Sequence, residues 1–154
     1  MRHLVFVSTD LFPWSTGAAG RLLSNLLRSL SESDRARSVV MMVDTHIEPA
    51  SFDAAFPGVR MLQLDTETAE PDVSTPQSPP ARAYVNAVGQ WRSAQIYRAL
   101  AVFARTANIE YVEFPARDGL AFCTLQERRL KGFLADALVA VRLQDSHTAL
   151  MQAE

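Results

Sequence analysis

The chain has 154 residues and lacks features that define several common protein classes. Its single cysteine, Cys123, excludes an internal disulfide and a cysteine-rich zinc site. Lysine also occurs once, at Lys131, which limits any mechanism that needs a lysine. No apolar run approaches the roughly 18 residues that a membrane-spanning helix needs. Basic and acidic residues number 15 and 17, and this balance argues against a nucleic-acid-binding protein, which carries a basic surplus.

The N-terminal stretch reaches an acidic residue, Asp10, too early to hold the apolar core of a signal peptide. Hydrophobic residues make up 48% of the chain, and its length suits one domain with a sizeable core. We therefore expect a single domain over residues 1–154, in a soluble and cytoplasmic protein.

Five short apolar runs suit strands that are buried on both faces, as in a parallel sheet. They cover residues 4–7, 39–43, 59–64, 111–114 and 138–143. The leucines of residues 22–30 form one face of a helix, and helices are also expected over 83–107 and 119–131, the last with Asp118 as its N-cap. The alternation predicts an α/β fold: a doubly wound, mostly parallel sheet with helices on both faces, Rossmann-like.

Two further segments lie between these elements. Residues 52–56 are expected to form one helical turn, and the polar, proline-rich residues 65–80 a surface loop. In doubly wound sheets, ligands bind beyond the carboxyl ends of the strands, where the strand order reverses. A strand order of 3-2-1-4-5 would bring the loops 9–20, 113–119 and 144–147 to one crevice.

The loop after the first strand contains Gly17 and Gly20, directly before the leucine-rich helix. Glycine lets backbone approach a ligand closely, and the free N–H groups at a helix N-terminus favour a phosphate. The same glycines also suit a plain strand-to-helix turn, so both readings stay open.

Glu113 lies within an apolar strand, where an unpaired carboxylate is costly. It is expected either to accept hydrogen bonds from a hydroxylated substrate or to pair with Arg117 or Arg142. His147 is the one histidine in the expected crevice. Asp44 and His46 follow another strand, but two ligands do not make a metal site.

Three separated stretches share a pattern with a known family. They are residues 4–8 with Phe12-Pro13, Thr16-Gly17 and the helix 21–30; Tyr111-Val112-Glu113-Phe114-Pro115; and Val141-Arg142-Leu143 followed by Gln144-Asp145-Ser146-His147. Together they resemble the N-terminal domain of family 4, glycogen-synthase-like glycosyltransferases, which have the two-domain GT-B fold. The resemblance spans the chain, while the stretch from Asp44 to Arg105 adds little to it.

The resemblance implies a role for individual residues. The glycine turn of the family approaches the donor diphosphate, which points to Gly17 and to Ala18, where the family has a second glycine. The family's sugar-contacting histidine is replaced by Gln144, and His147 matches the next histidine of that motif and is the one candidate catalytic residue. Glu113, Arg117 and Asp118 would line the acceptor-side cleft. No metal and no cofactor are expected.

The function implied by the resemblance belongs to a larger enzyme. This chain would be its acceptor-side half, inactive alone, and a C-terminal partner domain would bind the nucleotide-sugar donor. The intact enzyme would transfer a sugar from a nucleotide-diphospho-sugar to a sugar or lipid acceptor, with peripheral membrane association as a further expectation.

Two alternatives stay open. Thr16-Gly17-Ala18-Ala19-Gly20 resembles the glycine turn of short-chain dehydrogenases, and Asp44 ends the second strand where a ribose-binding acid of an NAD(P)-binding domain would lie. Against this, the turn does not directly follow the first strand, and Glu127 stands where the Tyr-x-x-x-Lys pair would need a tyrosine. The other alternative is a non-catalytic α/β interaction module.

Overall fold

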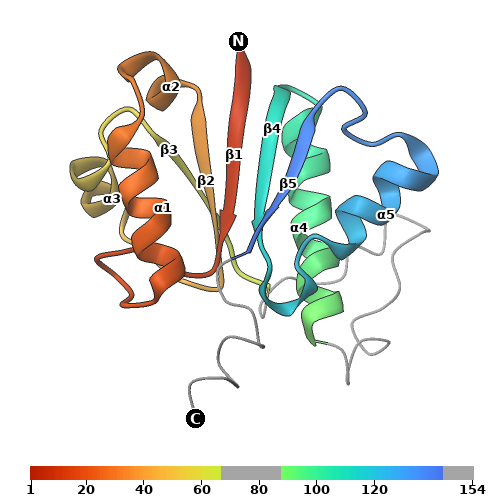
Figure 1. The fold of residues 1–154 in the computed structure, drawn as a ribbon, viewed down its shortest axis with the longest axis horizontal. Helices are drawn as coiled ribbons and strands as arrows, with labels where there is room; N and C mark the ends of the chain where they lie inside the picture. The colour runs from red at the N-terminus through yellow and green to blue at the C-terminus, as the bar shows by residue number, and fades with distance from the viewer. Residues whose placement is uncertain (67–87, 144–154) are drawn as a thin grey trace.

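The computed structural model describes residues 1–66 and 88–143 (Figure 1). The strands are β1 (Arg2–Ser8), β2 (Ser38–Val43), β3 (Arg60–Leu64), β4 (Asn108–Pro115) and β5 (Leu138–Arg142). The helices are α1 (Ala18–Ser29), α2 (Glu32–Ala36), α3 (Pro49–Ala55), α4 (Val88–Ala104) and α5 (Phe122–Lys131), with a 3-10 turn at Arg117–Gly119. None of the helices within these two ranges has the length and apolar character required to cross a bilayer.

The five strands form one all-parallel sheet in the order β3-β2-β1-β4-β5. Val5 at the centre of β1 pairs with Val39 of β2 on one side and with Val112 of β4 on the other. The order of the strands therefore reverses between β1 and β4. This confirms the predicted doubly wound α/β fold and its strand order.

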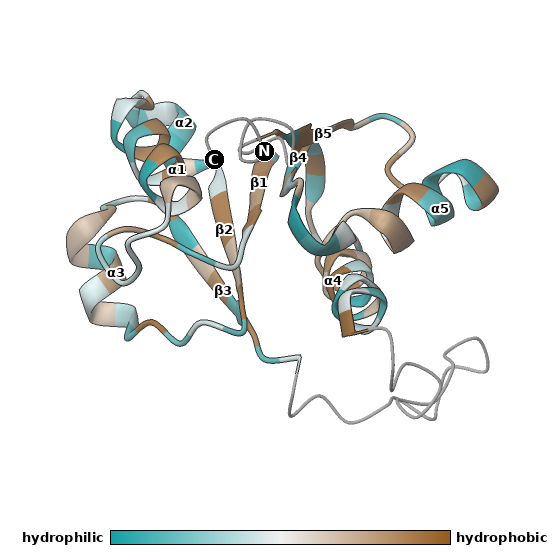
Figure 2. Ribbon diagram, turned by 60° about the horizontal axis from the view of Figure 1, so that its bottom comes forward, coloured by the Kyte–Doolittle hydropathy of each residue, from teal (hydrophilic) through white to brown (hydrophobic). Residues whose placement is uncertain are grey.

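Side chains that alternate along the strands belong to two buried hydrophobic clusters, one on each face of the sheet. On one face, strand residues pack against α1 and α3; this cluster contains Phe6, Val40, Met42, Leu23, Leu27, Phe52 and Phe56. On the other face, strand residues pack against α4 and the segment before α5; this cluster contains Val5, Val7, Met41, Val112, Phe114, Ile96, Leu100 and Leu120. Figure 1 shows α1 to α3 on one side of the sheet and α4 with α5 on the other, and the strands are largely apolar (Figure 2).

Two short helices flank β2. The predicted turn at residues 52–56 is the second half of α3, which begins at Pro49, a residue suited to the first helical turn. The sequence analysis missed α2, a five-residue helix that is too short to show an apolar periodicity. Its start is nevertheless encoded locally, because the Ser31 hydroxyl accepts a hydrogen bond from the Asp34 N–H at 3.1 Å.

Helix α4 differs from its predicted range at the carboxyl end. It stops at Ala104, and the N–H groups of Thr106 and Ala107 turn back onto the carbonyl of Phe103. Residues 83–87 of the predicted helix, and residues 67–80 of the predicted loop, lie outside the described residues. Gly89 is a packing requirement of α4, because a Cβ there would lie 2.5 Å from the carbonyl oxygen of Asp118.

The prediction that Asp118 is an N-cap is wrong. Helix α5 begins at Phe122 and is preceded by Ala121, which offers no side-chain cap. Asp118 lies in the 3-10 turn with a φ of 61°, because the backbone must bend sharply between β4 and α5 while passing close to Gly89. At the other end, α5 stops at Gly132, whose φ of 71° suits glycine.

Candidate functional site

The point of strand reversal brings together two of the three loops named by the sequence analysis. β1 and β4 are hydrogen-bonded neighbours, and the loops that follow them leave the sheet at the same end (Figure 1). These loops carry Gly17 and Ala18 on one side and Arg117 with Asp118 on the other. Gln144 and His147 lie outside the described residues.

The glycine turn before α1 is occupied by a side chain of the chain itself. A Cβ added at Gly17 would overlap the carboxylate of Asp10, and so would a Cβ added at Gly20. Gly20 also passes the backbone N–H of Leu11, 2.8 Å from where its Cβ would be. Packing therefore explains why both positions are glycine: a larger residue would displace the carboxylate of Asp10 from the first turn of α1.

The carboxylate of Asp10 lies where an anion would approach α1. Its Oδ1 atom is buried and has no hydrogen-bond partner, although Asp10 as a whole is half-buried. The N-cap residue, Gly17, has no side chain, so the first N–H groups of α1 have no N-cap side chain to accept their hydrogen bonds. Negative charge is favourable beside a helix N-terminus, so Asp10 takes up the electrostatic role that a bound phosphate would have.

Glu113, at the carboxyl end of β4, is paired with Arg142 of β5. Nε and an Nη atom of Arg142 both donate to Oε1 of Glu113, and the Tyr111 hydroxyl donates to Oε2. Of the two partners proposed from the sequence, Arg142 is therefore correct and Arg117 is not. The register places Arg142 opposite Pro115, one strand away and close enough to reach the carboxylate.

The carboxylate of Glu113 is buried, and its charge is balanced by the guanidinium of Arg142. Burial, together with the hydrogen bond to Glu113, raises the pKa of Tyr111 above its ordinary value of 10.0. Tyr111 is therefore a neutral donor at physiological pH. The arrangement can orient a polar ligand at the end of β4, but both oxygens of the Glu113 carboxylate already accept hydrogen bonds.

The expected acceptor-side residues Arg117 and Asp118 are exposed on the turn after β4. A serine of α4 anchors the chain directly after this turn. The Ser93 hydroxyl donates to the carbonyl of Leu120 at 2.9 Å and accepts the N–H of Cys123 at 2.8 Å. Burial raises the pKa of the Cys123 thiol, which argues against its use as a nucleophile.

Asp44, at the end of β2, is the centre of a second polar cluster. Its Oδ1 accepts hydrogen bonds from the N–H of Thr66 at 2.6 Å and from the Thr66 hydroxyl at 2.8 Å. Its Oδ2 lies 2.7 Å from Nε of Arg92, which comes from α4. Trp91 adds a hydrogen bond from its indole N–H to the carbonyl of Thr66 at 2.8 Å. The cluster ties the ends of β2 and β3 to α4.

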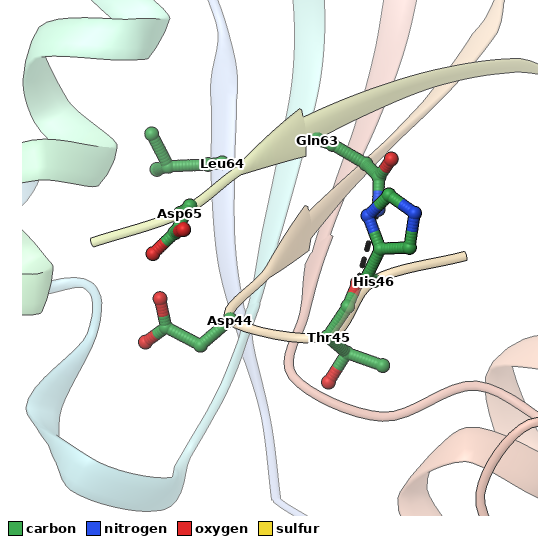
Figure 3. Close-up of a pocket in the computed structure, with 6 residues that line it drawn as sticks. All are labelled: Asp44, Thr45, His46, Gln63, Leu64 and Asp65. Atoms are coloured by element: carbon green, nitrogen blue, oxygen red, sulfur yellow. Dashed lines mark hydrogen bonds between the residues drawn. The ribbon is translucent and has the colours of Figure 1, made fainter. Parts of the chain in front are cut away.

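A shallow pocket of about 220 Å³ lies beside this cluster, at the ends of β2 and β3 (Figure 3). Asp44 and Asp65 line one side of it, and His46 and Gln63 line the other. Nδ1 of His46 lies within hydrogen-bond distance, 3.2 Å, of the side-chain amide of Gln63. Within residues 1–66 and 88–143, no three side chains are grouped as a metal site would require. The pocket is thus lined mainly by polar groups that already bond to their neighbours.

Sequence reasoning missed two contributors to these sites. Asp10 was considered only as the acidic end of the N-terminal stretch and as part of the loop 9–20, and no short pattern pairs it with glycines seven and ten positions further along. Arg92 carried no signal, because its partner is 48 positions away in the sequence and is reached only through the fold.

Comparisons with protein-family models, with curated proteins and with solved structures found no match to this chain.

Proposed function

We propose that this chain is the acceptor-side, N-terminal domain of a GT-B glycosyltransferase that resembles family 4. The observation that carries the proposal is the strand order, which reverses between β1 and β4. The reversal brings the glycine turn of α1 and the buried Glu113 cluster to one end of the sheet, from segments about a hundred residues apart. Ligands of doubly wound proteins bind at this point.

In the proposed enzyme, each side of the crevice has a separate task. The N-terminus of α1, at Gly17 and Ala18, would face the donor diphosphate, which the partner domain binds. The exposed turn with Arg117 and Asp118 would meet the acceptor, and Glu113 with Arg142 would hold the end of β4 in place. Gln144 and His147 remain part of the proposal as the residues that follow β5.

The position of Asp10 adds a condition to this proposal. A diphosphate cannot reach the first turn of α1 while a carboxylate lies against it, because like charges repel at short distance. The side chain of Asp10 must therefore move before an anion binds. We accordingly expect the chain alone to bind anions weakly.

The dinucleotide-binding alternative has less support. Nine residues separate the end of β1 from the start of α1, whereas the dinucleotide fingerprint needs the turn directly after the strand. The carboxylate of Asp44, which would have to bind the ribose, is instead bound to Thr66 and Arg92.

The binding half of the proposal is tested by following backbone amide shifts in NMR spectra. Uridine diphosphate should shift the amides of residues 17–20 weakly in the unmodified chain. Asp10→Asn should strengthen that binding by roughly tenfold, because it removes one like charge from the site. Asp53→Asn, an exposed acid on α3, is the matched control and should change nothing. NAD that binds more tightly than the diphosphate would favour the dehydrogenase alternative instead.

The catalytic half is tested on the protein encoded by the whole reading frame to which this chain belongs. Incubation with a panel of nucleotide sugars should release nucleoside diphosphate when an acceptor is present. Activity that depends on NAD(P) and not on nucleotide sugars would overturn the proposal.

A further inference from the structure

The strand β5 forms one open edge of the sheet. β4 pairs with it on the inner side, and within residues 1–66 and 88–143 no strand pairs with it on the outer side. Water can satisfy the outward N–H and C=O groups of such an edge, and their one regular protein partner is another extended strand. The backbone of β5 therefore determines what kind of segment can complete this edge.

β5 lacks the features by which natural proteins keep edge strands from pairing. It contains no proline and no lysine, and its one charged residue, Arg142, already belongs to an ion pair within the sheet. None of its five residues is buried, and Leu138 and Val141 are 65% and 42% exposed. The opposite edge strand, β3, instead exposes Arg60 and Gln63. A strand that joined β5 would therefore bury apolar side chains that now contact water.

The sequence of β5 is complementary to itself. Two antiparallel copies of the strand, centred on Ala140, place Val139 of each copy opposite Val141 of the other. On the other face of the strand, Leu138 of each copy lies opposite Arg142, whose aliphatic stem can cover it. The two arginines lie at opposite ends of the paired strands, so their like charges do not face each other. A second copy of the chain therefore fits this edge.

The area exposed on this side of the molecule approaches what a stable dimer needs. Figures 1 and 2 both show α5 beyond β5, on the side that faces away from β1. A strand added to β5 would therefore lie near this helix, whose side chains Phe122, Leu125 and Leu130 are exposed. With Leu138 and Val141, they expose on the order of 500 Å² before the backbone edge is counted, and a standard interface buries about 800 Å² per partner.

We propose that the chain forms a two-fold symmetric dimer in which the β5 strands of two copies pair antiparallel about Ala140. The five-stranded sheet of one copy then continues into the sheet of the other. Such a contact uses the same surface on both copies and closes on itself, as is usual for homodimers. The inference uses the edge of the sheet and does not depend on the proposed function.

The first test is the mass of the full chain in solution, measured by sedimentation equilibrium. We expect a concentration-dependent equilibrium between one and two copies. Leu138→Lys should weaken dimerisation by roughly tenfold or more, because it places a charge on the strand edge and removes apolar area from the interface. Leu22→Lys, on α1 and 51% exposed, is the matched control and should leave the equilibrium unchanged. Circular dichroism should show that both variants are folded.

The second test is disulfide cross-linking in a Cys123→Ser background, with oxidised glutathione as the oxidant. Ala140→Cys places the two introduced thiols opposite each other, within reach of a disulfide, and should link two copies. Leu138→Cys is a more exposed position, but its two thiols would lie at opposite ends of the paired strands and should stay unlinked. A chain that is monomeric at every concentration would overturn the proposal, as would equal effects of the two lysine variants or equally fast cross-linking at the two cysteine positions.

Discussion

At the residue scale, the pairing of Glu113 with Arg142 is the most constrained feature of the candidate site. The carboxylate is buried and accepts hydrogen bonds from two side chains on two strands. A buried charge that loses its partner is more costly than an exposed one, because no water replaces the lost interaction. The pair therefore couples the stability of β5, at the edge of the sheet, to the position of the carboxyl end of β4.

Arg142→Ala should lower the free energy of unfolding by about 3 kcal/mol, since it leaves the carboxylate of Glu113 buried without its ion-pair partner. The comparison is Arg37→Ala, which removes a more exposed ion pair with Asp34 and Glu110 and should cost less than about 1 kcal/mol. Urea unfolding followed by circular dichroism measures both. Similar losses in the two variants would contradict the assignment of Glu113 as a buried, dependent charge.

Tyr111 should make the folded state less stable at alkaline pH. Its pKa in the folded state is raised, so the unfolded chain loses this proton first, near pH 10.0. The contribution is complete below that pH and is lost progressively as the pH rises above it. Tyr97, whose pKa burial also raises, acts in the same direction. Tyr111→Phe should therefore make the alkaline decline in unfolding free energy shallower, as measured by urea unfolding at several pH values; an unchanged decline would refute this.

How far single residues could be predicted depended on how local their partners are. Glu113 was recognised as a charge that needs compensation, because it lies within an apolar strand. The choice between Arg117 and Arg142 required the parallel pairing of β4 and β5. The contacts of Asp10 with Gly17, and of Asp44 with Arg92, depend on the path of loops and on helix placement, which no short sequence pattern encodes.

At the scale of elements, the turn from β1 into α1 invites a direct test. Gly17→Ala should destabilise the fold by about 1–3 kcal/mol, because its Cβ would overlap the carboxylate of Asp10. In an Asp10→Ala background, the same substitution should cost little, since the nearest atoms around Gly17 all belong to that side chain. Gly20→Ala should stay costly in both backgrounds, because the backbone N–H of Leu11 remains 2.8 Å from its Cβ.

These variants form a double-mutant cycle, with unfolding free energy from urea denaturation as the measurement. A cost of Gly17→Ala that is equal with and without Asp10 would show that the carboxylate does not lie in the turn. It would then leave the first turn of α1 open to a ligand in the resting protein.

Whole elements were predicted more reliably than their ends or orientations. All five strands were found because buried parallel strands are short, continuous apolar runs. The predicted start of α5 was wrong. Aspartate is a common N-cap residue, but the bend after β4 places Asp118 in a 3-10 turn before the helix. The helix over 119–131 was predicted from a cap candidate and from its basic carboxyl end, and neither signal reveals that the leucines of α5 are exposed.

At the scale of the whole molecule, the sheet joins two hydrophobic clusters that share its central strands. β1 contributes Phe6 to one cluster and Val5 with Val7 to the other. The strand order could be predicted because right-handed crossovers and a crossover after β3 leave few topologies. The occupation of the turn before α1 could not, because the side chain of Asp10 reaches Gly17 and Gly20 only through the path of the loop.

The shared strands predict that both faces unfold as one cooperative unit. The two tryptophans report on opposite faces: Trp14 packs against Phe52 beside α3, with ring centroids 6.2 Å apart, and Trp91 lies on α4. In each single-tryptophan variant, Trp91→Phe or Trp14→Phe, the fluorescence midpoint in urea should coincide with the midpoint from circular dichroism.

The sharper form of this prediction places a cavity on the face opposite to the reporter. Leu27→Ala, on the buried face of α1, should lower the unfolding free energy by about 2–5 kcal/mol and should shift the transition seen by Trp91 as much as that seen by Trp14. Leu100→Ala, on α4, should do the same in reverse. Because β1, β2 and β4 supply side chains to both clusters, neither face can lose its packing without loosening the strands that the other face needs. A Leu27→Ala variant that moves only the Trp14 transition would mean that the two faces unfold independently.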